Sequence, residues 1–275
     1  GLRLALATNG TLVDDSMAER IREAGITRVS VSLDGAGRAT HDAFRGEPGA
    51  FDAAVAGLKH LRETGVSTQI NTTVARHNVD QLPGILKLAQ TLGAVAFHIF
   101  LLVPVGCGLK IAEDQTIRGE EYERVLSWFY DRSLDSGLEL KATCAPHYYR
   151  ILRQRRAEAR RAGERLPRLA SSGMHATTRG CLAGSAVCFI SHQGEVFPCG
   201  YLPVPAGDLR KDRFASIWEN AAVFQDLRDP GRLEGKCGLC EFKAVCLGCR
   251  ARAYGVTGNY MAEEPFCIYQ PHAAL

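Results

Sequence analysis

The sequence lacks the features that direct a chain to a membrane or to nucleic acid. Its 275 residues contain no apolar run close to the roughly 18 residues that cross a bilayer. Lysines and arginines exceed aspartates and glutamates only slightly, and the formal net charge of +3 is too small to indicate nucleic-acid binding. No segment resembles a secretion signal. With 46% hydrophobic residues, the chain can bury the core of one large domain and a smaller module.

Cysteine, in contrast, is abundant and unevenly placed. Eight of the ten cysteines lie between residues 181 and 267, as C-x6-C-x5-G-x4-C, then C-x2-C-x5-C-x2-C, then a final cysteine. Thiolates select zinc, copper(I) or iron–sulfur clusters, and four of them complete a site, so eight suit two sites. Gly238, inside the first close pair, allows the backbone to turn around a metal. The eight are Cys181, Cys188, Cys199, Cys237, Cys240, Cys246, Cys249 and Cys267.

Three other interpretations of these cysteines are open. Disulfide frameworks belong to small secreted domains, and no secreted context is visible, so we expect a reducing cytoplasm instead. Structural zinc is the main rival, because C-x2-C pairs serve zinc as often as iron. Buried inert thiols are a third possibility, which fits the isolated Cys107 and Cys144 better than the close pairs.

The first half of the chain alternates apolar strands with amphipathic helices, and the helices stop at Gly25, Gly65 and Gly93. This alternation predicts an α/β fold with a parallel sheet and right-handed crossovers. A further helix over 119–136 and a short strand over 138–141 follow. The first four predicted strands are 2–7, 28–33, 67–74 and 94–102. Ligands of such sheets sit beyond the carboxyl ends of the strands, here at Asn9, 32–34, 72–74 and Pro104, although Asn-Gly and Asp-Gly are also ordinary turns.

Two features connect the sheet to the cysteine-rich segment. Cys144 and His147 lie three residues apart where a helix begins behind Pro146, so both could reach one metal or one proton. The segment from Arg150 to Arg168 contains eight arginines. It is either a solvated helix and loop or a binding site for a polyanionic substrate, since arginine binds carboxylates through two N–H groups.

The cysteine pattern resembles the SPASM domain of radical S-adenosylmethionine (SAM) enzymes, whose last close pair is usually C-x3-C instead of Cys246-x2-Cys249. The resemblance implies two auxiliary 4Fe–4S clusters, although some members of the family carry one. The first cluster would be held by Cys181, Cys188, Cys199 and Cys249, and the second by Cys237, Cys240, Cys246 and Cys267.

The N-terminal half resembles the later part of a radical SAM partial (β/α)6 barrel. The run 7–10 is similar to the family's third-strand motif and the run 31–35 to its fourth, which implies that Asn9 and Ser32 approach the SAM. The sequence contains neither the C-x3-C-x2-C of the SAM-binding cluster nor the glycine-rich second-strand motif. We therefore expect a fragment, inactive alone, whose missing strands lie upstream of Gly1. The expected division is a barrel over 1–142, an arginine-rich connector over 143–175 and a SPASM domain over 176–275.

The whole chain resembles the haem b synthase branch of this family, on the runs 98–104, 141–149, 178–182 and 249–254. The resemblance implies oxidative decarboxylation of two propionates of iron-coproporphyrin III to vinyl groups, with an auxiliary cluster as electron acceptor. Alternatives are didecarboxysirohaem deacetylation, haem d1 precursor synthesis, peptide modification, and a non-enzymatic zinc or electron-transfer module.

On this hypothesis, the partners are a tetrapyrrole and an external flavodoxin-like or ferredoxin-like electron carrier. The arginines of 150–168, or Arg250 and Arg252, would meet the porphyrin carboxylates. Cys144 or His147 would face the porphyrin iron.

Overall fold

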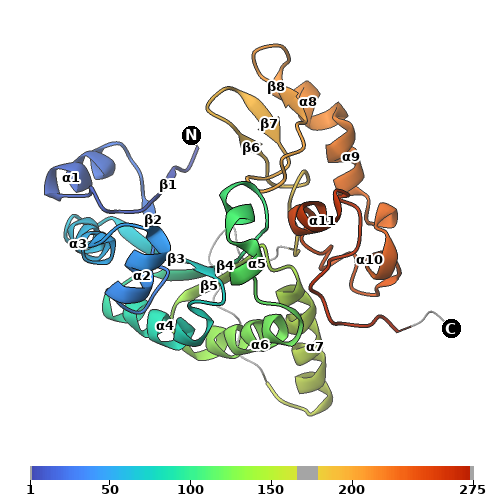
Figure 1. The fold of residues 1–275 in the computed structure, drawn as a ribbon, viewed down its shortest axis with the longest axis horizontal. Coiled ribbons are helices and arrows are strands. Elements are labelled where there is room, and N and C mark those ends of the chain that lie inside the picture. Colours follow the sequence, from blue (N-terminus) through green and yellow to red (C-terminus); the bar gives the residue numbers. More distant parts are fainter. Residues whose placement is uncertain (1, 166–178, 273–275) are drawn as a thin grey trace. The chain divides into compact units, whose positions relative to one another are not determined.

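The computed structural model describes residues 2–165 and 179–272, which form two compact units (Figure 1). Among the described residues, unit 1 comprises 2–101 and 131–143, and unit 2 comprises 102–130, 144–165 and 179–272. Arg168, Thr178 and the expected boundary between residues 175 and 176 lie outside the described residues. The three-part division of the chain therefore stays a prediction. No described helix is both long enough and apolar enough to span a bilayer.

Unit 1 is built on a five-stranded parallel sheet whose strands follow one another in sequence order. The strands are β1 (Ala5–Thr8), β2 (Arg28–Ser32), β3 (Ser67–Val74), β4 (Ala96–Leu101) and β5 (Glu139–Thr143). Every neighbouring pair is parallel, and Ser32, Asn71, His98 and Lys141 stand in register across β2 to β5. The predicted α/β class and parallel sheet are confirmed.

Helices connect the strands of unit 1 and cover the apolar side chains of the sheet. They are α1 (Asp15–Glu23), α2 (Arg38–Arg45), α3 (Ala50–Glu63), the short η1 (Val79–Gln81) and α4 (Leu82–Thr91). The apolar face consists of alternate strand residues such as Val31, Ile70 and Ile99, all fully buried, and Leu58 of α3 and Ile85 of α4 are equally buried. This alternation places the remaining, mostly polar, strand residues on the opposite face.

The predicted elements of unit 1 are right in kind; the strand over 67–74 has the predicted ends, and the ends of the other strands differ by up to three residues. β1 ends on Thr8 instead of Ala7, and β4 starts at Ala96 instead of Ala94. The sequence analysis missed α2, which has His41 as its one buried residue and therefore shows no apolar period. Gly46, with a left-handed φ of 69°, ends this helix.

Unit 2 contains short elements around the cysteines. Its helices are η2 (Gly106–Lys110), α5 (Ala112–Gln115), most of α6 (Gly119–Asp135), α7 (His147–Arg161), α8 (Phe214–Asn220), α9 (Ala222–Arg228), η4 (Pro230–Arg232), α10 (Gly235–Leu239) and α11 (Arg250–Thr257). Its strands β6 (Phe189–Ile190), β7 (Glu195–Phe197) and β8 (Gly207–Asp208) form an antiparallel sheet. A compact apolar cluster that includes Val196, Phe224 and Leu247 supports these elements, and several cysteines pack against it.

Candidate metal centres

The second predicted cysteine set lines a single cavity of unit 2. The thiols of Cys237, Cys240, Cys246 and Cys267 all face this cavity, and α10, its C-terminal cap, the following loop and the C-terminal segment supply one each. Segments far apart in the sequence therefore bring four soft ligands to one place, as a four-thiolate cluster site requires.

Backbone N–H groups surround the sulfur atoms of this second set. Glu264 N–H donates to Cys237 Sγ at 3.3 Å, and Phe242 N–H donates to Cys240 Sγ at 3.4 Å. Burial raises the pKa of Cys267 to about 11, while the N–H of Tyr269 lowers it in part. N–H donors of this kind stabilise the negative charge of a thiolate or a cluster.

Cationic side chains also approach the second set. Arg150, Lys236 and Lys243 line the cavity. Burial raises the pKa of the Cys240 thiol, and the charge of Arg150 opposes that shift. A four-thiolate iron–sulfur cluster is an anion, so this lining fits such a group.

The first predicted set behaves differently, because three of its four members influence one another. Burial raises the pKa of Cys181, and Cys249 adds to the shift. Burial raises the pKa of Cys199 to about 12, to which Cys181 and Cys249 also contribute. For Cys188 burial is the cause of a raised pKa, with no contribution from another thiol.

Cys144, an isolated cysteine in the sequence, joins these three. Its thiol is hydrogen-bonded to Cys249, and this bond is the main reason that the pKa of Cys249 falls to about 7 while that of Cys144 rises. Cys144 has a φ of 54°, a conformation that L-residues adopt rarely. Cys144 therefore lies beside Cys249 and Cys199, and it also packs against the apolar cluster of unit 2.

A buried ion pair lies between the two cysteine sets. Arg252 and Glu264 are both 0% exposed, with Nη1 and Oε2 3.3 Å apart. Glu264 Oε2 accepts a hydrogen bond from Cys249 N–H at 2.8 Å, while Glu264 N–H donates to Cys237 Sγ. One residue therefore contacts a cysteine from each set.

The proposed role of Arg250 and Arg252 in carboxylate binding is wrong. Arg250 is 2% exposed and donates to the carbonyl oxygens of Tyr260 and Ala262. Arg252 donates to the carbonyl oxygen of Cys144 at 2.6 Å, besides its pairing with Glu264. Both guanidinium groups are committed to holding the cysteine-bearing segments together.

The arginine-rich segment is mostly the solvated helix that one interpretation predicted. Residues 150–161 belong to α7, where arginines such as Arg153 and Arg160 are exposed. Arg150 is the exception at 3% exposed, because it pairs with Glu123 Oε2 at 2.5 Å and stacks over Tyr269 at 4.8 Å.

His147 lies in the wall of the second cavity, at the start of α7 as predicted. It is 2% exposed, and burial lowers its pKa to about 4, so the ring is neutral. Neither ring nitrogen has a hydrogen-bond partner among the described residues. A fully buried imidazole of this kind calls for a partner outside the described residues.

In unit 1, the face of the sheet opposite its helices carries a row of polar residues. The row is Ser32, Asn71, His98 and Lys141, paired strand to strand from β2 to β5. Gln69 Nε2 bonds both Asn71 Oδ1 at 2.7 Å and His98 Nδ1 at 2.9 Å. Ser32, predicted to approach SAM, thus belongs to a larger polar surface.

Asn9, the other predicted SAM residue, does not belong to this row. It follows β1, it is exposed, and its Oδ1 accepts hydrogen bonds from the N–H and the hydroxyl of Thr11. This geometry is that of an Asx turn, one of the interpretations that the Asn-Gly dipeptide left open.

Sequence reasoning missed Asn71, His98 and Lys141. A signal was present, because Gln69, Asn71 and Thr73 alternate with Ile70, Thr72 and Val74, which are all buried. Strands of parallel sheets covered on both faces are usually apolar throughout. Polar residues on alternate positions of such a strand therefore indicate a face that apolar side chains do not cover.

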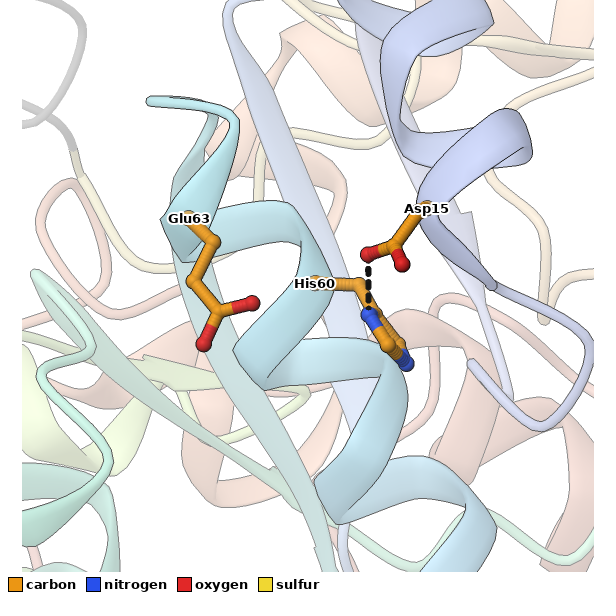
Figure 2. A group of neighbouring side chains, drawn as sticks. All are labelled: Asp15, His60 and Glu63. Carbon is orange, nitrogen blue, oxygen red and sulfur yellow. Dashed lines mark hydrogen bonds and ion pairs between the residues drawn. The ribbon is translucent and has the colours of Figure 1, made fainter.

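A separate group of potential ligands lies on the surface of unit 1 (Figure 2). Asp15 of α1 and His60 and Glu63 of α3 place one ligand atom each within 4.8 Å of one another. Asp15 Oδ1 and His60 Nδ1 are 2.5 Å apart, and Asp15 is 80% exposed. The geometry is that of an exposed ion pair, so we assign no metal there.

Two family models match the chain. Residues 1–89 match the radical SAM superfamily, and residues 181–249 match SPASM, an iron–sulfur cluster-binding domain. These ranges contain β1 to β3, with Ser32, and seven of the eight predicted cluster cysteines.

Curated proteins are similar to nearly the whole chain. The AdoMet-dependent heme synthase of Methanosarcina barkeri (strain Fusaro / DSM 804) is 52% identical over 98% of this chain and 76% of its own length. The enzyme of that name from Oleidesulfovibrio alaskensis is 51% identical, over 98% and 69%. Pre-heme d1 synthase of Dinoroseobacter shibae is 32% identical, over 96% and 67%.

Solved structures of peptide-bound enzymes share the fold. Streptococcus suis SuiB bound to precursor peptide SuiA has a TM-score of 0.68 at 15% identity, over 98% of this chain and 59% of its own. Native anSMEcpe with bound AdoMet and Cp18Cys peptide has a TM-score of 0.62 at 18% identity, over 94% and 70%. At such identities the likeness concerns the fold alone.

Proposed function

Because the chain belongs to the family of radical SAM enzymes with a SPASM domain that includes the AdoMet-dependent haem synthases, we propose that it decarboxylates iron-coproporphyrin III to haem b. The observation that carries this proposal is the 52% identity to a haem synthase over 98% of the chain. Relatives named for peptide substrates or for other tetrapyrroles are less similar, such as the mycofactocin maturase at 29%.

Each decarboxylation leaves one surplus electron, so the reaction needs an electron acceptor. SAM bound to the enzyme would accept one electron from an external donor and give methionine and the 5′-deoxyadenosyl radical. Hydrogen abstraction by this radical from the β-carbon of a propionate, followed by cleavage of the bond to the carboxylate, would give 5′-deoxyadenosine, carbon dioxide, a vinyl group and one electron. The four-thiol cavity of unit 2 is suited to a cluster that takes up this electron. A flavodoxin-like or ferredoxin-like carrier would then remove it, and a reducing cytoplasm would keep the thiols free.

The residues of this chain have separate tasks on this proposal. We assign the second cluster to Cys237, Cys240, Cys246 and Cys267, which share a cavity. For the first cluster, Cys181, Cys199 and Cys249 are joined by either Cys188, as in the family pattern, or Cys144, which is hydrogen-bonded to Cys249. Ser32 and the polar row beside it would contact SAM or substrate, and Asn9 would lie at the edge of this site.

The test is turnover by the native full-length protein under anaerobic conditions with SAM, a reductant and iron-coproporphyrin III. The expected products are haem b, two carbon dioxide molecules per tetrapyrrole, and 5′-deoxyadenosine. Didecarboxysirohaem and a haem d1 precursor are run as competing substrates. Conversion of one of these without conversion of iron-coproporphyrin III would contradict the proposed substrate while leaving the enzyme class intact.

A further inference from the structure

His147 is a buried residue of unit 2 whose ring nitrogens have no hydrogen-bond partner among the described residues. The residue is 2% exposed, and both ring nitrogens are themselves buried. Its ring packs edge-on against Tyr122 at 6.0 Å, which holds its orientation. A neutral imidazole always has one N–H donor, and leaving that donor buried and unpaired is unfavourable.

Arg150, one helical turn further along α7, shows the same deficit. Its Nη1 and Nη2 donate to Gln154 and Glu123, whereas Nε is buried without a partner in the described part of the chain. Residues three apart on a helix present their side chains to the same side. His147 and Arg150 both line the cavity of the second cysteine set, so two unpaired donors border the same space as four thiols.

We propose that His147 and Arg150 donate hydrogen bonds from these N–H groups to sulfur atoms of the cluster held by Cys237, Cys240, Cys246 and Cys267, and that they thereby raise its reduction potential. The inference rests on the proposed function only in assuming a cluster in this cavity. It gives His147 a role at the cluster in place of the expected contact with the porphyrin iron. Both are positioning residues, because they act on the reaction through the cluster.

The physical reason is the charge that the cluster gains on reduction. When the cluster accepts the electron released by decarboxylation, its negative charge grows by one, and N–H groups aimed at its sulfur atoms stabilise the reduced form more than the oxidised form. The positive charge of Arg150 acts in the same direction. Together they would make this cluster the more readily reduced of the two, which suits an electron acceptor.

The experiment compares His147→Phe and Arg150→Met with Arg153→Met, a matched control on the exposed side of α7. Iron and sulfide are counted first, and then each protein is titrated with reductant while its electron paramagnetic resonance spectrum is recorded. The redox step of the second cluster is the one lost in Cys240→Ala. We expect full iron content and a more negative midpoint for that step in both variants, no change in the control, and loss of an exchangeable-proton hyperfine coupling in His147→Phe.

Two results would overturn the inference. The first is an unchanged midpoint in both variants with full iron, which would mean that neither nitrogen reaches the cluster. The second is loss of about four irons in both His147→Phe and His147→Gln, which would make His147 a ligand or a packing element. Gln keeps an N–H donor, so the proposal requires it to retain the cluster near the original potential. If the parent protein itself lacks the Cys240-dependent step, the cluster assignment fails and the inference fails with it, whereas an unchanged midpoint in protein that shows this step overturns the inference alone.

Discussion

Two glycines are required where backbone segments of unit 2 approach each other around the cysteines. A Cβ added to Gly238 would lie 2.1 Å from the carbonyl oxygen of Leu233, and one added to Gly180 would lie 2.2 Å from that of Cys246. Gly180 and Cys181 pair with the segment of Val245 and Cys246 through two backbone hydrogen bonds. Close packing of backbone, and not a left-handed turn, explains the glycine inside the first C-x2-C pair.

The first prediction concerns Gly238→Ala. The methyl group must displace backbone, because the nearest atom is a carbonyl oxygen and not a flexible side chain. We expect the second cluster to be lost, with iron content falling by about four per chain, and a loss of stability of about 1–3 kcal/mol. Gly37→Ala is the control, since a Cβ there meets nothing within 4 Å. Full iron content in Gly238→Ala would contradict this account.

The second prediction decides the fourth ligand of the first cluster. If Cys188 is the ligand, Cys188→Ala loses about four irons and Cys144→Ala keeps them. The opposite result would follow if Cys144, whose thiol is hydrogen-bonded to that of Cys249, is the fourth ligand of the first cluster. Iron and sulfide analysis of the two variants separates these cases. Full iron content in both single variants, together with loss of about four irons in the double variant, would show that either thiol can act as the fourth ligand.

At the scale of single elements, strands β2 to β5 have an apolar face that packs against helices and a polar face on the opposite side. Lys141 of β5 stands in register with His98, and its partial burial lowers its pKa. Glu139, two residues earlier on the same strand, is paired with Arg28 at 2.8 Å, whereas no described residue forms an ion pair or hydrogen bond with Lys141. A half-buried ammonium in the same row as Ser32 and Asn71 is therefore available for a carboxylate of SAM or of the tetrapyrrole.

The third prediction follows from this availability. Lys141→Met removes a charged hydrogen bond to a carboxylate, worth about 1.5–3 kcal/mol, so we expect KM for SAM or for the tetrapyrrole to rise roughly tenfold or more. Lys141→Arg restores part of the loss, and Lys59→Met, an exposed lysine of α3, serves as control. Unchanged KM for both ligands in Lys141→Met would remove Lys141 from the site.

The fourth prediction concerns α2, which the sequence analysis missed. His41 Nδ1 accepts the N–H of Asp34 at 3.0 Å, which requires a neutral ring. Burial lowers its pKa, with Asp34 and Asp42 opposing and Arg45 assisting. Because the folded pKa lies below the unfolded value of about 6.5, the unfolded state binds the proton more readily. Stability is therefore present above that pH and falls as the pH drops below it, by at most about 1.4 kcal/mol per pH unit.

Urea unfolding at pH 7.5 and pH 5.5 tests this sign. His41→Asn keeps an acceptor for the Asp34 N–H but does not titrate, so we expect its loss of stability between the two pH values to be smaller than in the parent chain. Contributions from other groups, including the cysteine sites, are common to both proteins and cancel in the comparison. An equal pH dependence in both would assign the effect elsewhere.

At the scale of the whole molecule, the sequence predicted the parts whose signal is local. The strand–helix alternation predicted the parallel sheet, and the resemblance to the SPASM domain predicted the set of thiols that line the second cavity. Contacts between distant segments could not be predicted. Cys144 contacts Cys249, and Arg252 pairs with the buried Glu264. No sequence pattern links the two residues of either pair. Arginines beside cysteines looked like substrate contacts, because sequence alone does not reveal that their partners are internal.

The central claim is that the cysteines hold two iron–sulfur clusters, and metal analysis of the anaerobically purified chain tests it most directly. The account predicts about eight irons and eight sulfides per chain without zinc, that is, two clusters of four thiolates each. About four irons would retain the enzyme class and remove one ligand set. Stoichiometric zinc in protein never exposed to air would contradict the account, because the cavity of Cys237, Cys240, Cys246 and Cys267 would then be a structural site.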